Sequence, residues 1–589
     1  MVNIVINGKN FEVPSDISIL EAAQMAKVEI PHLCYLKDIN EIGACRLCCV
    51  EVEGEDRLIP ACENKVKEGM VITTNSAKVK NAVRMNLELI LSQHQGQCTS
   101  CARSGNCQLQ NLADEYHLAC DRYPKANDVV EKWNANFPII RDAKKCIQCM
   151  RCVAVCDKVQ GLHVWDLINQ GSASHIGVSG NRTIEAADCS ACGQCITHCP
   201  VGALTERNDT EKVRRALADP ETVTVVQIAP AIRSAYAELL GIDPKEATVA
   251  RLAGVLKKMG FDYVFDTCFT ADLTIMEEGS ELLRRLKAGD LKKYPMFTSC
   301  CPGWIRFIKS QYPELLPQLS TAKSPQQMFG ALIKSYFAEK MGVDAKKIFS
   351  VSIMPCTAKK AEAELPELAD EQGVPDVDVV LTTREIMNLF QEERVDLRDV
   401  EEVPFDTLFG DYTGAGVIFG TTGGVMEAAL RSAYFLVTGK NPDADAFSNI
   451  RAVDFTDAGV SYSNQDASQA NWREATFDLA GSPICIAVTS GLVNTRKLIE
   501  AILAGEVAYD FVEIMACPGG CAGGGGQPIH ADDLERGMLR GQVLRDIDAA
   551  SAVRFSHENK DVQKLYQDWL GEPGSHLAEK YLHVEHVVS

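Results

Sequence analysis

Residues 513–528 read EIMACPGGCAGGGGQP, and this stretch decides what the second half of the chain encloses. Its two cysteines, Cys517 and Cys521, stand in a turn dense with glycine, which lets backbone approach a bulky group that side chains would exclude. Two further loops carry cysteine, TSCCPGW at 298–304 and IMPCTAKKAEAE at 353–364. A hydrophobic core does not favour adjacent cysteines beside Pro and Gly turns. The three loops therefore predict a cofactor site rather than packing.

The segments around these loops alternate between strand-like and helix-like patterns from about residue 210 onward. Examples are TVTVVQIAP at 222–230 and ATVARLAGVLKKMGF at 247–261. Such alternation predicts parallel sheets covered by helices on both faces, with functional loops at the strand ends.

Cysteine dominates the composition: 24 occur in 589 residues, and those from Cys98 to Cys199 often stand at CxxC spacing. In a chain long enough for several structural units, this pattern predicts metal ligation rather than the disulfides of a short secreted scaffold. The net charge of −21 disfavours binding to nucleic acid or to an anionic membrane surface. The sequence shows neither an export signal nor an apolar stretch of about 18 residues. We expect a cytoplasmic protein without membrane insertion.

Residues 1–78 predict a small sheet-and-helix domain, because short alternating runs precede the helical stretch ILEAAQMAK. Its spaced cysteines suit a 2Fe-2S centre of the plant-ferredoxin type with altered gaps. The predicted ligands are Cys34, Cys45, Cys48 and Cys62. Cys49 opens an apolar strand directly after a ligand, so we expect it to point away and to be buried.

Residues 79–125 contain HQGQCTSCARSGNCQLQ, with His94, Cys98, Cys101 and Cys107 as candidate ligands. Three thiolates and an imidazole at this spacing suit zinc or a 4Fe-4S cluster. The position between other cluster motifs favours iron, and the segment resembles a module of hydrogenases and of respiratory complex I.

Residues 126–210 carry two CxxCxxCxxxC runs and resemble a bacterial two-cluster ferredoxin. The runs supply Cys146, Cys149, Cys152 and Cys156, then Cys189, Cys192, Cys195 and Cys199. In that fold the fourth cysteine of each run ligates the other cluster, which implies that Cys199 joins the first centre and Cys156 the second.

The three loops quoted first resemble the signature segments of the iron-only hydrogenases almost residue for residue. FTADLTIMEEGSE, STAKSPQQMFG, IFGTTGGVMEAALR and the closing SHENKDVQKLYQDWLG extend the resemblance over essentially the whole chain. It implies a multidomain α+β and α/β fold, with ferredoxin-like modules before a two-lobed α/β catalytic domain at 211–535 and a helical small-subunit-like segment at 536–589.

The resemblance also implies an H-cluster: a 4Fe-4S cubane joined to a two-iron subcluster with CO, cyanide and a dithiolate-amine bridge. The implied cubane ligands are Cys301, Cys356, Cys517 and Cys521, the last also bridging to the two-iron unit. One 2Fe-2S and three accessory 4Fe-4S clusters complete the cofactors.

The resemblance also implies roles for residues that stand at matching positions in these segments. Cys300 matches a non-ligand thiol that takes the proton from the bridging amine, and Lys359 matches a donor to a cyanide. The route to solvent continues through Glu278, Ser320 and Glu281, with Glu362 an unassigned neighbour of the second loop. Lys360, beside Lys359, is expected to be the solvated lysine of the pair. The pocket candidates are Met354, Met515, Gln326, Phe419 and Pro230, and the cysteines expected to be structural are Cys120, Cys268 and Cys485.

The implied function is reversible oxidation of H2 to protons and electrons. An H2 sensor or iron–sulfur scaffold is disfavoured by the presence of Cys300 and Lys359, and a complex I or formate dehydrogenase subunit by the signature loops. No strand followed by GxGxxG is visible, so NAD(P) requires separate flavin and iron–sulfur subunits. We expect a catalytic subunit of an NAD(P)-linked complex, of the kind that can bifurcate electrons, with a stand-alone enzyme using ferredoxin as the alternative.

Overall fold

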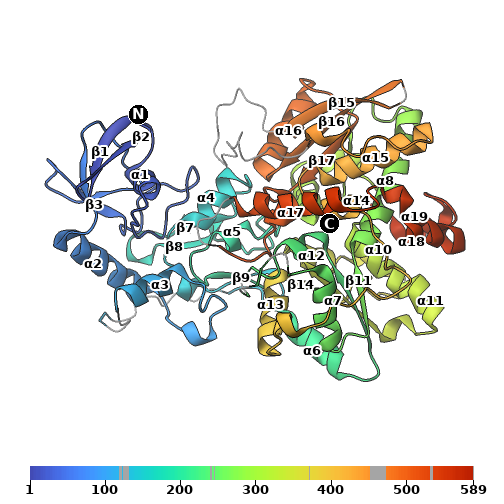
Figure 1. The fold of residues 1–589 in the computed structure, drawn as a ribbon, viewed down its shortest axis with the longest axis horizontal. Helices are drawn as coiled ribbons and strands as arrows, with labels where there is room; N and C mark the ends of the chain where they lie inside the picture. The colour runs from blue at the N-terminus through green and yellow to red at the C-terminus, as the bar shows by residue number, and fades with distance from the viewer. Residues whose placement is uncertain are drawn as a thin grey trace. The chain divides into compact units, whose positions relative to one another are not determined.

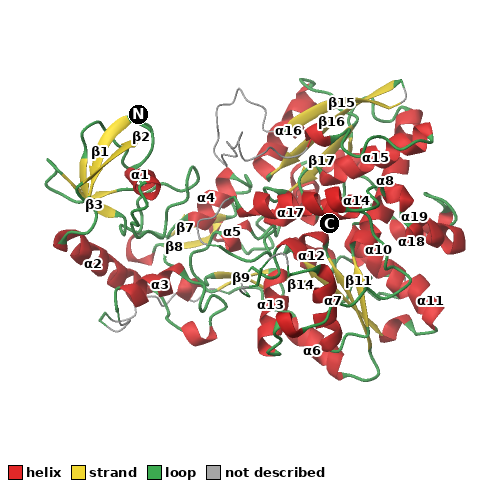
Figure 2. Ribbon diagram, viewed as in Figure 1, coloured by secondary structure: helices red, strands yellow, loops and turns green. Residues whose placement is uncertain are grey.

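The chain forms two compact units, each of which mixes helices with strands (Figures 1 and 2). A computed structural model describes residues 1–118, 122–123, 132–238, 240, 242–243, 246–370, 372–450, 472–479, 481–530 and 535–587. Apart from the gaps, unit 1 takes Met1–Ala187 and His198–Thr205. Unit 2 takes Asp188–Thr197, Glu206–Gly459 and Asp466–Ser589.

Unit 1 begins with a five-stranded sheet in the order β2-β1-β5-β3-β4. Strand β1 pairs antiparallel with β2 and parallel with β5. Helix α1 starts at a capping box in which Ser18 and Glu21 satisfy each other's backbone N–H groups, and it buries Leu20 against the sheet. The bounds are β1 Val2–Ile6, β2 Lys9–Val13, α1 Ile19–Met25, β3 Cys49–Val52, β4 Ile59–Pro60 and β5 Val71–Thr73. The predicted sheet-and-helix domain is confirmed.

The rest of unit 1 consists of short elements joined by the cysteine-bearing loops. Strand β6 pairs with β9, and β7 pairs antiparallel with β8. The bounds are α2 Ala77–Gln93, α3 Gln108–Glu115, β6 Ile139–Arg141, α4 Arg151–Lys158, β7 Trp165–Ile168, β8 His175–Val178 and β9 Leu204–Glu206.

Unit 2 contains a four-stranded parallel sheet in the order β11-β10-β13-β14. Neighbouring residues of β10 pack on opposite faces: Val226 joins a core with α7 and α13, whereas Val225 joins another with α8 and α10. The sheet is therefore covered on both sides, as its apolar strands predicted. The bounds are α6 Thr210–Ala218, β10 Val223–Ile228, α7 Val249–Lys258, β11 Tyr263–Asp266, α8 Cys268–Ala288, α10 Pro325–Leu332, β13 Ile348–Met354, β14 Val379–Thr382 and α13 Thr383–Glu392.

A second sheet of unit 2 has the order β12-β17-β16-β15 and its own core. Three of its strands are parallel, but β15 forms an antiparallel hairpin with β16 that the alternating pattern did not predict. The bounds are β12 Met296–Phe297, β15 Arg473–Leu479, β16 Ser482–Ser490, α16 Leu492–Ala504 and β17 Phe511–Met515. Two sheets with separate cores agree with a two-lobed domain.

Shorter helices complete unit 2, and its C-terminal segment is helical. The bounds are α5 Gln194–Thr197, α9 Pro302–Gln311, α11 Ala338–Met341, α12 Ala358–Glu362, α14 Gly414–Ile418, α15 Gly424–Thr438, α17 Arg536–Ala550, α18 Lys560–Leu565 and α19 His576–Leu582. Within the described ranges, no helix combines the length and the apolar character needed to span a membrane.

Candidate active site

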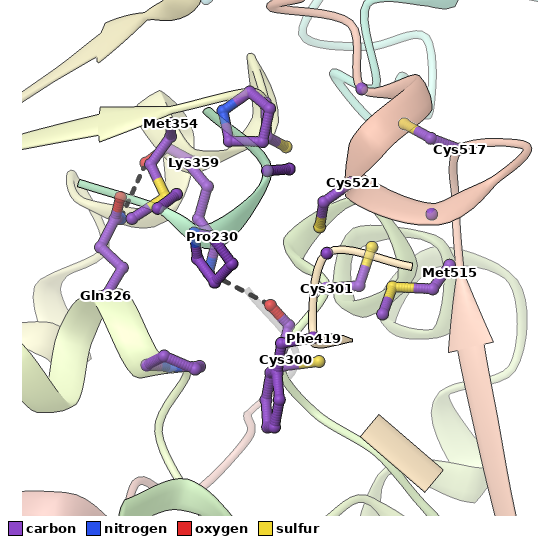
Figure 3. Close-up of a pocket in the computed structure, with 18 of the residues that line it drawn as sticks. Pro230, Cys300, Cys301, Gln326, Met354, Lys359, Phe419, Met515, Cys517 and Cys521 are labelled. Atoms are coloured by element: carbon purple, nitrogen blue, oxygen red, sulfur yellow. Dashed lines mark hydrogen bonds between the residues drawn. The ribbon is translucent and has the colours of Figure 1, made fainter. Parts of the chain in front are cut away.

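A cavity of about 740 Å³ lies in unit 2 where strands of both sheets end. Pro230 follows β10, Cys300 follows β12, and Cys356 follows β13. Because the carboxyl ends of parallel strands meet at one edge of a sheet, loops from distant parts of the chain converge there. The predicted residues that line the cavity are Pro230, Cys300, Cys301, Gln326, Met354, Cys356, Lys359, Phe419, Met515, Cys517 and Cys521 (Figure 3).

The four predicted cubane cysteines share this cavity wall. Burial raises the pKa of the thiol of Cys521 to about 12, and it raises that of Cys356 beyond the usual range, with neighbouring cysteines adding to the effect. Thiolates gathered in so dry a place need a positive charge close by. Iron supplies such a charge, so the donor set fits an iron–sulfur cluster. No group of three His, Cys, Asp or Glu side chains in the described ranges has the geometry for one metal ion, as expected where a larger cluster is held.

The glycine loop packs backbone against backbone. A Cβ on Gly524 would lie 2.2 Å from the carbonyl oxygen of Pro355, and one on Gly523 would lie 2.1 Å from that of Pro518. At Gly520, where φ is +76°, a Cβ would lie 2.7 Å from the nitrogen of Thr422. Only glycine fits at these positions, which explains the GGGG run.

Lys359 is held inside the cavity wall by two partners. Its Nζ donates to both carboxylate oxygens of Glu362, at 2.9 and 2.8 Å. It also donates to the carbonyl oxygen of Cys300 at 3.1 Å (Figure 3). Burial would lower the pKa of Lys359, but the Glu362 carboxylate raises it above its ordinary value. The ammonium group therefore stays charged beside the cavity. Glu362, unassigned from the sequence, also accepts from Ser324 and Gln326 at 3.0 Å.

Glu278 and Glu281 lie on one face of α8, and both are buried instead of forming a solvated helix edge. Burial, with a contribution from Glu281, raises the pKa of Glu278 to about 8, so its carboxyl is mostly protonated at pH 7. Neither carboxyl oxygen of Glu278 has a hydrogen-bond partner of good geometry among the described residues. The Ser320 side chain and the Ser299 backbone nevertheless lie close enough to lower the pKa of Glu278 against the effect of burial. A buried carboxyl with such loosely aligned partners suits a proton carrier.

The next two predicted groups are joined by a short hydrogen bond. The hydroxyl of Ser320 donates to Glu281 at 2.9 Å. Glu281 also accepts from the backbone nitrogen of Thr321 at 3.0 Å and from Arg285 at 2.5 Å. Arg285 is the most exposed group of this set, with 18% of its side chain accessible. The chain of groups thus approaches the surface at Arg285.

Some expectations need correction or extension. Lys360 is not the solvated lysine: it is fully buried and pairs with Asp209 and Glu385 at 2.8 and 3.0 Å, because α12 turns it away from solvent. The cavity is also lined by Thr267 and Pro325. Thr267 directly precedes α8 and Pro325 begins α10, but neither carries a metal-ligand pattern that sequence reasoning could have used.

The N-terminal domain of unit 1 gathers its four predicted 2Fe-2S ligands. The sulfurs of Cys48 and Cys62 lie 3.3 Å apart, and the Cys34 sulfur interacts with those of Cys45 and Cys62. Cys49 is buried in β3, as expected.

His94 and three cysteines line a second cavity of about 280 Å³ in unit 1. The Nδ1 of His94 donates to the carbonyl oxygen of Lys145 at 2.8 Å, so Nε2 is the unprotonated nitrogen when the ring is neutral. This second hydrogen bond is the usual way of orienting a metal-ligating histidine. The cysteines are Cys98, Cys101 and Cys107.

In the ferredoxin-like region, Cys199 lies with the first run of cysteines and not with its own. Burial raises the pKa of Cys149 and of Cys152, and the charge of the nearby Cys199 thiolate raises both further. Cys189, Cys192 and Cys195 belong to unit 2, whereas Cys156 belongs to unit 1 and accepts there from the nitrogen of Val164.

The cysteines without a predicted ligand role have structural surroundings where they are described. Cys268 is buried at the start of α8, and Cys485 on β16 contacts Thr476 across the hairpin at 3.3 Å. Cys120 lies outside the described residues.

Comparisons with family models divide the chain into five matched regions. Residues 222–525 match the iron-only hydrogenase large subunit, C-terminal domain, and residues 535–588 match the iron hydrogenase small subunit. Residues 1–77 match a 2Fe-2S iron-sulfur cluster binding domain. Residues 84–121 match the NADH-ubiquinone oxidoreductase-G iron-sulfur binding region, and residues 138–205 match the ferredoxin-like domain of NADH-quinone oxidoreductase subunit 3. The match at 84–121 favours iron over zinc beside His94.

Two relatives align along the whole chain. The NADP-reducing hydrogenase subunit HndD of Solidesulfovibrio fructosivorans is 43% identical over 100% of this chain and 99% of its own length. Iron hydrogenase 1 of Clostridium pasteurianum is 36% identical over 100% of both chains. Among solved structures, the [FeFe]-hydrogenase HydA1 of Chlamydomonas reinhardtii, in its apo form, is 41% identical with a TM-score of 0.55, and the match covers 64% of this chain and 98% of that one.

Proposed function

This chain belongs to the iron-only hydrogenases, and from that premise we propose that it is the catalytic subunit of an NAD(P)-linked complex that oxidises H2 reversibly. The observation that supports this choice most is the full-length likeness to a subunit named NADP-reducing. Two regions that match NADH–quinone oxidoreductase modules point in the same direction. Such a complex implies a cytoplasmic enzyme with flavin-containing partner subunits.

We propose that Cys301, Cys356, Cys517 and Cys521 would hold the cubane of an H-cluster. When bound, this cofactor supplies the metal site for H2 and the electron store that the protein's own side chains lack. The polypeptide provides a dry enclosure, because the cavity is lined almost entirely by apolar atoms. Met354 and Met515 add polarizable packing at the cavity wall.

The proton is proposed to travel from Cys300 to Glu278, then by way of Ser320 to Glu281, whose carboxylate is held by Arg285 near the surface. Burial raises the pKa of Cys300 well above its usual value, so the thiol holds its proton until a neighbour receives it. Glu278 has a pKa near neutrality, which suits both uptake and release. The Ser320–Glu281 hydrogen bond supplies the next step toward the surface, where Arg285 is partly exposed.

Lys359 is proposed to fix the cofactor by a charge-assisted hydrogen bond to a cyanide. Glu362 would keep Lys359 charged and aimed at the cavity. Gln326, Phe419 and Pro230 would shape the remaining wall.

Electrons are proposed to leave through one 2Fe-2S and three accessory 4Fe-4S clusters held by the cysteine groups of residues 34–199. His94 in place of a fourth thiolate removes one negative charge from its cluster and should raise that cluster's potential. The accessory ligand sets proposed are Cys34, Cys45, Cys48 and Cys62; His94, Cys98, Cys101 and Cys107; Cys146, Cys149, Cys152 and Cys199; and Cys156, Cys189, Cys192 and Cys195.

Anaerobic purification from the host tests the electron partner. The purified material should contain flavin-bearing subunits and should reduce NAD or NADP with H2, alone or together with ferredoxin. Activity with ferredoxin alone, without a co-purifying flavoprotein, would overturn the complex and support the stand-alone alternative.

A further inference from the structure

Two cysteine loops of unit 2 touch through their backbones: the 189–195 loop of the ferredoxin-like region and the glycine loop of the catalytic cavity. A Cβ on Gly525 would lie 2.2 Å from the carbonyl oxygen of Cys192 and 2.6 Å from the Cα of Gly193. The sulfur of Cys517 lies 3.9 Å from that same carbonyl oxygen. A side chain at position 525 would not fit into this contact.

Three side chains tie the 189–195 loop to the rest of unit 2, and one of them, Gln194, reaches the glycine loop. Thr357 donates to the carbonyl oxygen of Ala191 at 2.6 Å, and Arg306 donates to that of Cys189 at 3.0 Å. Thr357 follows the cavity residue Cys356, and Arg306 lies on α9. In the third bond the donor lies on the 189–195 loop, because the Nε2 of Gln194 donates to the carbonyl oxygen of Gly523 at 2.9 Å.

Gln194 also reaches a proposed cubane ligand. It is 4% exposed, and a carboxamide nitrogen carries two hydrogens, so it can serve two acceptors. The sulfur of Cys517 lies at the same contact, 3.9 Å from the carbonyl oxygen of Cys192, and the Gln194 side chain forms a hydrogen bond with that sulfur. The Gln194 amide therefore bridges a carbonyl and a sulfur of the cavity loop.

We propose that Gln194 is a positioning residue that raises the reduction potential of the cubane by donating an N–H to the Cys517 sulfur, although it stands in the sequence motif of the neighbouring cluster. This inference rests on the proposed ligation of the cubane by Cys517. One-electron reduction adds a negative charge that spreads onto the ligand sulfurs, and a donor at a sulfur stabilises that charge. The electron is exchanged with the neighbouring cluster, and no bond or proton is transferred.

The test is an infrared-monitored redox titration of the anaerobically matured full chain, in which the CO and cyanide bands report the state of the H-cluster. Gln194→Leu should move the cubane midpoint to a more negative potential. The shift should correspond to about tenfold in the equilibrium constant, or about 59 mV for one electron. Thr357→Val is the matched control, because it removes another hydrogen bond to the 189–195 loop, the one to the carbonyl oxygen of Ala191, without removing a donor to Cys517. Its midpoint should stay in place.

An unmoved midpoint in Gln194→Leu, or an equal shift in Thr357→Val, would overturn the inference. Iron content and the H-cluster bands establish that each variant is loaded. If the Leu variant loses iron, Gln194→Glu, which keeps the side chain's size but adds negative charge, decides the matter: it must also shift the midpoint downward. Absence of H-cluster bands in the unaltered chain would instead overturn the proposed function.

Discussion

Cys300 is the residue on which the proposed chemistry depends most, because it is a cavity thiol outside the four-cysteine set. Cys300→Ser should lower H2 evolution by about 10²-fold or more, since a hydroxyl is a far weaker acid than a thiol. Iron content should be unchanged. The measurement is H2 evolution with a reduced artificial donor alongside iron analysis.

The matched control is Cys485→Ser, which makes the same exchange at a hairpin cysteine outside the cavity. It should evolve H2 at the unaltered rate. Normal evolution by Cys300→Ser would remove Cys300 from the proton route.

Glu278 provides a prediction on pH. Its pKa is about 8 in the folded protein, against about 4.3 in an unfolded chain, so the folded state holds the proton across that interval. Unfolding then releases a proton within this window, and the stability of the folded state falls as pH rises through it. Each unit of difference corresponds to about 1.4 kcal/mol.

Glu278→Gln removes this dependence while keeping a neutral side chain of the same size. The apparent unfolding temperature of the unaltered chain, measured anaerobically at pH 5, 7 and 9, should therefore fall relative to that of the variant as pH rises. A constant difference between the two proteins would show that Glu278 titrates normally in the folded state. The variant should also lose most of its turnover.

Residue types alone showed which side chains could bind metal, because thiolates and imidazole have few other uses at such spacing. The residue types did not show which charged side chains are buried. Lys359 and Lys360 are adjacent and chemically identical, yet Lys359 lines the cavity whereas Lys360 is buried against two carboxylates. The sequence did not show this difference, because the partners of Lys360, Asp209 and Glu385, lie elsewhere in the chain.

At the scale of elements, the C-terminal segment is anchored to α8 by buried carboxylates, and Asp272 is the one that holds the SHEN motif. Asp272 accepts from the nitrogen and hydroxyl of Thr413, from Ser556 and from Asn559, all within 2.9 Å. Burial raises the pKa of Asp272 to about 6, against the opposing effect of these donors. The SHEN motif thus owes its position to hydrogen bonds with a helix almost 300 residues earlier.

Asp272→Ala should destabilise unit 2 by about 3 kcal/mol, because it leaves several buried donors without an acceptor. Anaerobic thermal unfolding measures this, with Asp561→Ala as the control. Asp561 accepts a single bond in an exposed setting, from the nitrogen of Asp411, and its loss should cost little. An equal, small effect of both variants would contradict the anchoring role.

The order of helices and strands along the chain could be predicted better than the contacts between distant segments. Alternating patterns predicted parallel strands with helices on both faces, and the strand ends predicted the cavity. The pairing of Ala322 with His583 could not be predicted, because it joins segments 261 residues apart and no local pattern encodes it. The same holds for the contact between Gly193 and Gly525.

At the scale of the whole molecule, the chain combines a catalytic unit with a series of electron carriers, and it carries a net charge of −21. The charge favours partners with basic or neutral docking faces. The cysteine spacing could show that electrons travel but not where they go, because no nucleotide-binding motif in this chain identifies the acceptor.

The central claim is that the cavity itself splits H2, and isotope exchange tests it without any electron partner. The anaerobically matured chain, supplied with D2 in ordinary water, should form HD, as followed by mass spectrometry, and Cys300→Ser should slow the exchange strongly. A fully iron-loaded chain that forms no HD would contradict the claim.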